Sequence, residues 1–267
     1  MNYQKFMPEG WNEESLPFSA DILNCAKSTG EILQGRVSKC DSNYNLYVDL
    51  GNKITGVIPR EEVEAINVDE TGFPKPNICI SKVNKLVQFK VKDIDSRDNY
   101  ILSRKEVGKQ AIGWIKDELE EGMIINGIVK SIQPYGAFVE IGGGVVGLLH
   151  IEDISIARIK SPSERLKIGQ KINVVVKCID KKLERVILSY KEMLGNWEDN
   201  IQYFQEGSTV TGIAREIEKF QNGIFIELKP NLVGMAEYVE GIEYGQKVNV
   251  YIKKIIPEKK KVKLLIV

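Results

Sequence analysis

The chain has 267 residues, of which 43% are hydrophobic and 28% are charged, a composition typical of folded, soluble proteins and unlike that of disordered ones. Its 37 basic residues are balanced by 37 acidic ones. This balance excludes a uniformly basic coat for nucleic acid, although it allows a local basic face.

The N-terminal extension, residues 1–29, has neither the basic stretch nor the apolar stretch of a signal peptide. No apolar run approaches the roughly 18 residues that a membrane span needs, so we expect a soluble, cytoplasmic protein without a membrane partner. The four cysteines are scattered and only one histidine is present, so we expect reduced thiols and no metal site. Because the extension carries Trp11 and Phe18, we expect it either to cap the domain that follows or to dock a partner.

Three copies of one sequence pattern follow this extension. They open with GEILQGRV at Gly30, GMIINGIV at Gly122 and GSTVTGIA at Gly207, each with a second glycine five positions on. Further along, LYVDLGNKITGVI, AFVEIGGGVVGLL and IFIELKPNLVGMA align without gaps. Such self-similarity indicates tandem repeats, which we place at residues 30–105, 122–191 and 207–267.

Within each repeat, short runs of alternating apolar and polar residues are broken by turn residues, which predicts antiparallel strands. Five strands with one longer connection before the fourth are typical of a small Greek-key barrel of the OB type. Between the repeats, at residues 106–121 and 192–206, the apolar period becomes helical. The fold prediction is therefore all-β: three tandem five-stranded OB-fold barrels joined by short helical linkers, whose apolar stripes, including Trp114 and Trp197, pack on a neighbouring barrel.

The middle repeat contains GGGVVG, in which Gly142, Gly144 and Gly147 satisfy the letters of the G-x-G-x-x-G dinucleotide fingerprint. That fingerprint lies between a strand and a helix, whereas the residues after Gly147 are typical of another strand. The equivalent turns of the other repeats also lack the three glycines. We therefore expect a flexible turn between two strands at Gly142–Gly144, and no bound cofactor.

One strand of each repeat places an aromatic residue between aliphatic ones. Neighbouring side chains of a strand point to opposite faces, so the aliphatic set fills the barrel and the aromatic residue stands outside it. The outward residues are Tyr47, Phe138 and Phe225, and the inward ones are Leu46, Val48, Leu50, Ala137, Val139, Ile141, Ile224, Ile226 and Leu228. Single-stranded bases stack on such exposed rings, unless a loop or a neighbouring domain covers them.

The middle repeat contains G-x-x-x-x-G-x-V, Y-G-A-F-V, G-L-L-H and I-D followed by R-V-I-L-S, a pattern that resembles the S1 RNA-binding motif. In that family, RNA lies across a barrel face built from two aromatic residues, a histidine, an aspartate and an arginine. The resemblance implies the corresponding residues of this chain: Tyr135, Phe138, His150, Asp180 and Arg185. The rings would stack on bases, Arg185 would contact a phosphate or stack, and Asp180 would orient the last hairpin. His150 would stack or hydrogen-bond, and a purely structural role for it stays open.

The flanking repeats depart from this pattern, although the resemblance extends over them. The first keeps Tyr44 and Tyr47, but Pro59 stands in place of the histidine. The third keeps Phe225 and offers Lys261 in the basic run PEKKKVK, which is either a solvated hairpin tip or a phosphate contact. The resemblance implies that both repeats bind RNA more weakly, or bind protein instead.

The leading hypothesis is a non-catalytic protein that binds single-stranded RNA. The resemblance points to messenger RNA in translation and to contact with the small ribosomal subunit. The alternative is a protein-interaction scaffold in which only the middle repeat binds RNA, which the degenerate flanking repeats and the zero net charge favour. No nucleophile–base motif, metal-ligand cluster or phosphate-binding loop supports an enzyme, so we expect no catalytic residues and no small-molecule substrate.

Overall fold

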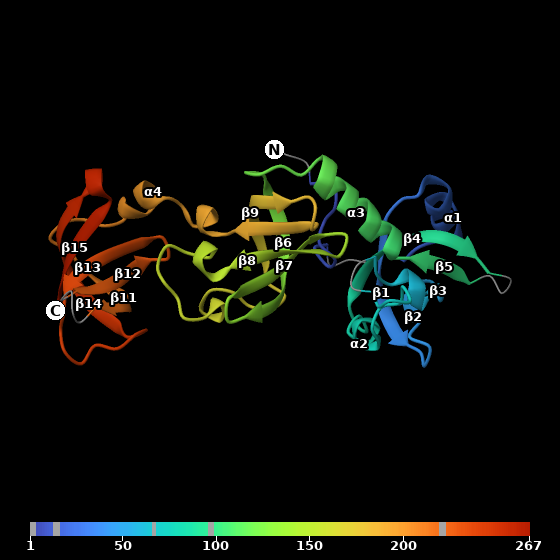
Figure 1. Ribbon diagram of the computed structural model, residues 1–267, viewed down its shortest axis with the longest axis horizontal. Helices are drawn as coiled ribbons and strands as arrows, with labels where there is room; N and C mark the ends of the chain where they lie inside the picture. Colours follow the sequence, from blue (N-terminus) through green and yellow to red (C-terminus); the bar gives the residue numbers. More distant parts are fainter. Residues whose placement is uncertain (1–3, 13–16, 66–67, 96–98, 219–222) are drawn as a thin grey trace. The chain divides into compact units, whose positions relative to one another are not determined.

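The computed structural model describes residues 4–12, 17–65, 68–95, 99–218 and 223–267, and Figure 1 labels its α-helices and most of its strands. Three closed five-stranded barrels follow one another along the chain. Around each barrel the first three strands are neighbours in sequence order, and the fifth strand lies between the third and the fourth. The prediction of three tandem OB-type barrels is confirmed.

The first barrel consists of β1 (Leu33–Cys40), β2 (Leu46–Asp49), β3 (Thr55–Ile58), β4 (Leu86–Ile94) and β5 (Tyr100–Ser103). The middle barrel consists of β6 (Ile124–Gln133), β7 (Gly136–Gly142), β8 (Val145–His150), β9 (Lys171–Asp180) and β10 (Arg185–Ser189). The third consists of β11 (Thr209–Glu218), β12 (Gly223–Lys229), β13 (Leu232–Glu237), β14 (Lys247–Ile256) and β15 (Lys261–Ile266). The α-helices are α1 (Ala20–Thr29), α2 (Pro76–Ile80), α3 (Lys105–Asp117) and α4 (Trp197–Ile201). Among the described residues, the 3-10 helices are η1 (Arg60–Glu62), η2 (Ile151–Asp153), η3 (Pro162–Glu164), η4 (Lys191–Leu194) and η6 (Pro257–Lys259).

By its contacts the chain divides into two compact units, and the division passes through the middle barrel. The first unit holds residues 1–128, 139–147 and 179–186, and the second holds residues 129–138, 148–178 and 187–267. The strands lie within the predicted repeats, whose ends stay a prediction.

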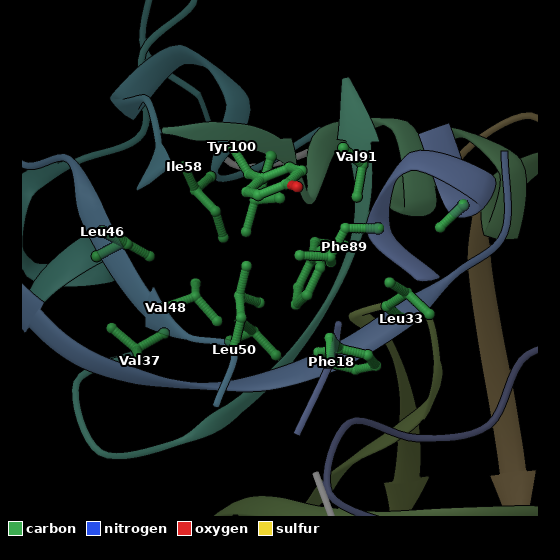
Figure 2. Close-up of a cluster of buried hydrophobic side chains, with 14 of the residues drawn as sticks. Phe18, Leu33, Val37, Leu46, Val48, Leu50, Ile58, Phe89, Val91 and Tyr100 are labelled. Atoms are coloured by element: carbon green, nitrogen blue, oxygen red, sulfur yellow. The ribbon is translucent and has the colours of Figure 1, made fainter. Parts of the chain in front are cut away.

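The core of the first barrel is filled by the inward aliphatic residues that the alternation predicts. Leu46, Val48 and Leu50 are almost fully buried, and Phe89 of β4 completes the packing (Figure 2). Phe18 from the N-terminal extension joins the same cluster, together with two residues of α1, Leu23 and Ala26. The extension therefore caps the first barrel, which is one of its two expected roles.

The repeated second glycine has a steric reason. A Cβ atom on Gly35 would lie 2.6 Å from a methyl group of Val48, and one on Gly212 would lie 2.4 Å from a methyl group of Ile226. Real Cβ atoms do not make such short contacts. Glycine at these positions lets β1 pass close to β2, and β11 close to β12, so that each barrel can close.

The inward residues of the other two barrels are also confirmed. Ala137, Val139 and Ile141 have no exposed surface, nor have Ile224 and Ile226, while Leu228 is partly buried. The helical linkers are present as α3 and as η4 with α4. In the second linker Trp197, Ile201 and Phe204 pack into the core cluster of the third barrel, as the helical period predicts.

Residues 4–12, which we call the N-terminal strap, contact both the first barrel and strands β6 and β7 within the first unit. The side-chain amide of Gln4 accepts a hydrogen bond from the Asn126 backbone (2.7 Å) and donates one to the Ile141 carbonyl (2.7 Å). The ring of Phe6 is buried, with its centroid 6.0 Å from that of Trp114 in α3.

Gly142–Gly144 form the predicted turn between two strands, β7 and β8. Gly142, Gly143 and Gly144 all have positive φ angles, so they adopt a backbone conformation that favours glycine. A Cβ atom at these positions would lie 2.2 Å from the Phe6 carbonyl oxygen, 2.5 Å from the Cβ of Ala111, and 2.2 Å from the Arg104 guanidinium, respectively. The turn is closely packed against the strap and α3, which the sequence pattern alone does not reveal.

In the described part of the chain, the helices are too short or too polar to traverse a bilayer.

Candidate nucleic-acid interface

The middle barrel presents an aromatic pair at the β6–β7 corner. Tyr135 is 50% exposed and Phe138 is half-buried. Their ring centroids lie 6.3 Å apart with an interplanar angle of 88°, an edge-to-face arrangement favoured by the charge distribution of aromatic rings. Gly136 between them has no room for a side chain, because a Cβ there would lie 2.5 Å from the Leu149 carbonyl oxygen. The chain therefore passes close to β8 here, which brings the pair next to the end of that strand.

His150 ends β8 and lies in the same part of the molecule as the aromatic pair. The amide of the following residue, Ile151, donates a hydrogen bond to the Tyr135 carbonyl oxygen (2.9 Å). The His150 side chain caps η2, with Nδ1 3.4 Å from the amide nitrogen of Glu152. Nδ1 also lies 3.7 Å from the carboxylate oxygen Oε2 of Glu152. The side chain is 41% exposed, so a ligand can reach the imidazole ring.

Asp153 fixes the loop that carries His150, although it is not among the residues that the S1 motif predicts. Its buried carboxylate accepts hydrogen bonds from Lys177 (2.7 and 2.8 Å) and from Lys191 (2.9 Å). Burial alone would raise the pKa of Asp153, but the two ammonium groups hold it below its usual value. Glu62 occupies the equivalent position of the first repeat and binds Lys92 (2.5 Å). Because the carboxylate–lysine pair recurs at the same positions, a comparison of the first and middle repeats could have identified Asp153 from the sequence.

Asp180 and Arg185 lie at the two ends of the β9–β10 hairpin, whose tip belongs to the first unit. Asp180 accepts hydrogen bonds from the turn amides of Lys182 and Leu183 (both 3.0 Å). These contacts agree with the expected role of Asp180 in orienting the hairpin. Arg185 is exposed. The aromatic pair and His150 belong to the second unit, so the structure brings together three of the five expected residues.

The two expected rings of the first barrel are already in contact with cations. The Arg60 guanidinium lies 5.1 Å from the ring centroid of Tyr44 and 5.3 Å from that of Phe73, and it donates two hydrogen bonds to the Pro74 carbonyl oxygen. The Lys39 ammonium lies 4.2 Å from the ring centroid of Tyr47. One face of each tyrosine is therefore occupied by a side chain of the protein itself.

In the third barrel, Phe225 is half-buried on the outer face of β12, and Lys261 is exposed at the start of β15. Phe225 lies opposite Met235 of β13, which is 51% exposed. Within the described residues, no group of three or more histidine, cysteine, aspartate or glutamate side chains is placed to hold a metal ion.

Comparison with known proteins identifies a family that matches most of this chain. The model of the S1 RNA binding domain matches residues 27–105 and 118–191, so that the third barrel lies outside the matched ranges. The chain is 30% identical over 253 residues to the small ribosomal subunit protein bS1 of Staphylococcus aureus (strain COL), covering 88% of this chain. It is 36% identical over 158 residues to the bS1 protein of Rickettsia typhi, covering 57% of this chain and 27% of that protein.

The chain spans 61% of the length of the Staphylococcus aureus relative. Among solved structures, GSP13 from Bacillus subtilis matches with 29% identity over 29% of this chain and 60% of that one, at a TM-score of 0.28.

Proposed function

Because the chain belongs to the S1 RNA-binding domain family, we propose that it binds single-stranded RNA without catalysing a reaction, chiefly through the outer face of its middle barrel. The observation that carries this proposal is the aromatic pair of the exposed Tyr135 and the half-buried Phe138, set edge-to-face beside His150. Two rings at right angles offer stacking surfaces in two directions.

Each group of the middle barrel has a physical role in this proposal. A base stacked on Tyr135 or Phe138 contributes on the order of 1–3 kcal/mol, whatever the base. His150 offers its imidazole ring for a hydrogen bond to a base or phosphate, and the exposed Arg185 offers a guanidinium to a phosphate. Asp180 holds the hairpin that carries Arg185. Because stacking accepts any base, the sequence preference is weak.

The flanking barrels contribute less through their aromatic rings. Arg60 and Lys39 occupy one face of Tyr44 and of Tyr47, so a base would have to displace a cation or use the other face. Phe225 and Lys261 of the third barrel provide a ring and a charge for RNA. Tethering three barrels on one chain raises the overall affinity, since binding at one barrel increases the effective RNA concentration at the others.

The cellular role that we propose is in translation, with messenger RNA as the ligand and the small ribosomal subunit as a partner, in the cytoplasm. Its support is the name of the relatives, which are small ribosomal subunit proteins. The proposal includes the domain limits given above: an extension at residues 1–29, and repeats separated by the linkers 106–121 and 192–206.

A protein-interaction scaffold is the second candidate, and the covered rings of the first barrel favour it. In this version, Tyr44 and Tyr47 with their cations form part of a surface for a protein, and only the middle barrel binds RNA.

The proposal is tested by titrating the full chain with a labelled, unstructured RNA of about 20 nucleotides, longer than the roughly 4–16 that one OB barrel covers. Phe138→Ala should weaken binding roughly 5- to 150-fold, the equivalent of one lost stack of 1–3 kcal/mol. Tyr203→Ala is the matched control, because Tyr203 is an exposed aromatic residue (67%) outside the barrel strands, and it should leave the affinity unchanged.

Three other outcomes are informative. If the wild-type chain does not bind at low salt, the RNA proposal fails. If Phe138→Ala and Tyr203→Ala bind equally well, the middle barrel face is not the site. If Tyr47→Ala weakens RNA binding as much as Phe138→Ala, the first barrel also binds RNA. The protein-interaction scaffold, in which only the middle barrel binds RNA, is then wrong.

A further inference from the structure

The third barrel carries a row of four outward side chains on four adjacent strands. Lys254 of β14 lies opposite Lys263 of β15, Lys263 lies beside Met235 of β13, and Met235 lies opposite Phe225 of β12. We call these four residues the lysine row. With neighbouring strands about 4.8 Å apart, the row spans roughly 14 Å across the barrel.

The direction of these side chains follows from their neighbours. Val262 and Leu264, on either side of Lys263, are buried in the barrel core, so Lys263 points outward. Ile255, next to Lys254, packs against the same core, which turns Lys254 outward as well. Both lysines are exposed, and Met235 is 51% exposed.

This lysine pair does not help the barrel to fold. Lys254 follows a register shift in β14, after which it lies opposite Lys263, and like charges in cross-strand pairs are destabilising. In the part of the chain that the structure describes, neither Lys254 nor Lys263 takes part in an ion pair. Glu216, opposite Phe225 at the far end of the row, is bound by Arg158 instead. Both lysines thus point outward without an ion pair among the described residues, while the Glu206 carboxylate accepts a hydrogen bond from the Ile255 amide beside Lys254.

The first barrel provides an internal comparison. Its equivalent row is Asp93, Ile101, Val57 and Tyr47, with the same pairing between strands. Asp93 is negative and binds Lys27 (2.8 Å). In the middle barrel, the aligned positions hold Cys178 and Ile187. The two lysines are therefore a feature of the third barrel, the one outside the range matched by the family model, and not a requirement of the fold.

We propose that the lysine row is a second RNA site, in which Lys254 and Lys263 together hold a backbone phosphate while the adjoining base rests against Met235 and Phe225. This inference rests on the proposed RNA-binding function. A phosphate between the two ammonium groups removes their repulsion, and the apolar half of the row lies one strand spacing away, within reach of the base. The third barrel would then bind RNA mainly through charge, and the middle barrel mainly through stacking.

The test compares two double variants of the full chain in the same RNA titration at several salt concentrations. Lys254→Gln with Lys263→Gln removes two phosphate contacts, so the salt slope should become shallower by about 1.4, at roughly 0.7 per contact for a single strand. If the row variant and the wild type bind equally well at 1 M salt, this change of slope corresponds to about 25-fold weaker binding of the variant at 0.1 M salt. The control, Lys167→Gln with Lys247→Gln, removes the same charge from two exposed lysines outside the row and should change neither quantity.

The outcomes separate this inference from the proposed function. If Phe138→Ala weakens binding but the row variant behaves like its control, the lysine row is not an RNA site while the middle barrel remains one. If the row variant alone weakens binding, the lysine row stands and the middle-barrel site fails. If poly-glutamate displaces RNA from the wild type but not from the row variant, at a concentration matched in charge, the row is a site for acidic protein and the inference is overturned.

Discussion

At the scale of single residues, the first unit is held by a buried ionic cluster that joins segments far apart in the sequence. The Glu9 carboxylate accepts hydrogen bonds from Nε and Nη2 of Arg104 (2.6 and 2.9 Å), and both side chains are buried. Arg104 also contacts Glu64 (2.8 Å), and the Glu9 amide donates to Glu140 (2.8 Å). Burial alone would raise the pKa of Glu9, but Arg104 and Lys82 hold it at about 2.

Glu9→Gln should therefore destabilise the first unit. Arg104 would lose its bidentate partner while buried, which costs about 3 kcal/mol, at the lower end for a broken buried pair because Glu64 remains. The measurement is the free energy of unfolding from urea titration at pH 7. Lys5→Gln, which removes the exposed Lys5–Glu118 pair, should cost less than about 1 kcal/mol. Equal losses in the two variants would contradict this account.

The same pair predicts a pH dependence. The pKa of Glu9 falls from its usual 4.5 to about 2 on folding, so its contribution is fully present above about pH 4.5 and is lost as the pH falls towards 2. The difference in stability between the wild type and Glu9→Gln should accordingly shrink over this acid range. A difference that is constant between pH 7 and pH 3 would contradict the low pKa.

At the scale of elements, the β7–β8 turn and the N-terminal strap depend on each other. Gly142 has a φ of +131° and lies against the backbone of Phe6. The strap in turn contacts the end of β7, where the side chain of Gln4 donates a hydrogen bond to the Ile141 carbonyl oxygen. The turn is therefore a contact surface whose shape requires the absence of a side chain.

Gly142→Ala should displace the strap and lower the stability of the first unit. Gly122→Ala is the matched control, because Gly122 also has a positive φ (+88°) but a Cβ there would meet nothing within 4 Å. The control should cost about 1 kcal/mol, from backbone strain alone. Gly142→Ala should cost about 1–3 kcal/mol more, from overpacking. Hydrogen exchange of the amides of residues 4–12 should become faster in Gly142→Ala only; unchanged exchange would show that the strap tolerates the side chain.

At the scale of the whole molecule, the second linker is a structural part of the third barrel. Trp197 of α4 is 9% exposed and belongs to the core cluster of the third barrel. Its indole nitrogen is buried, and among the described residues it has no hydrogen-bond partner. The third barrel is thus completed by a residue that lies before the start of its repeat.

Trp197→Ala should destabilise the third barrel by about 3–5 kcal/mol, the cost of a large cavity. Trp197→Phe should cost less than about 2 kcal/mol, since it keeps most of the ring and removes a buried donor that has no acceptor. Hydrogen exchange of β12 and β14 measures this barrel separately from the rest. If both variants leave that exchange unchanged, Trp197 does not belong to the core.

Much of this architecture could be predicted from the sequence alone. Alternation of side chains along a strand is local, so the inward set of Val48, Val139 and Ile226 and the outward set of Tyr47, Phe138 and Phe225 follow from the order of residues. The repeat and its motif predicted three barrels and the family. The aromatic pair of the middle barrel could also be named, because both residues lie within four positions of the same corner.

Only the tertiary structure decided which of these outward side chains are open to a ligand. Arg60 covers Tyr44 from a different loop, and the strap reaches the β7–β8 turn from more than 130 residues away. The lysine row depends on the register of four strands, which places Lys254 opposite Lys263, and Lys263 beside Met235. Such contacts are set by strand register and by the paths of loops, which arise from the packing of the whole chain and leave no period in the sequence.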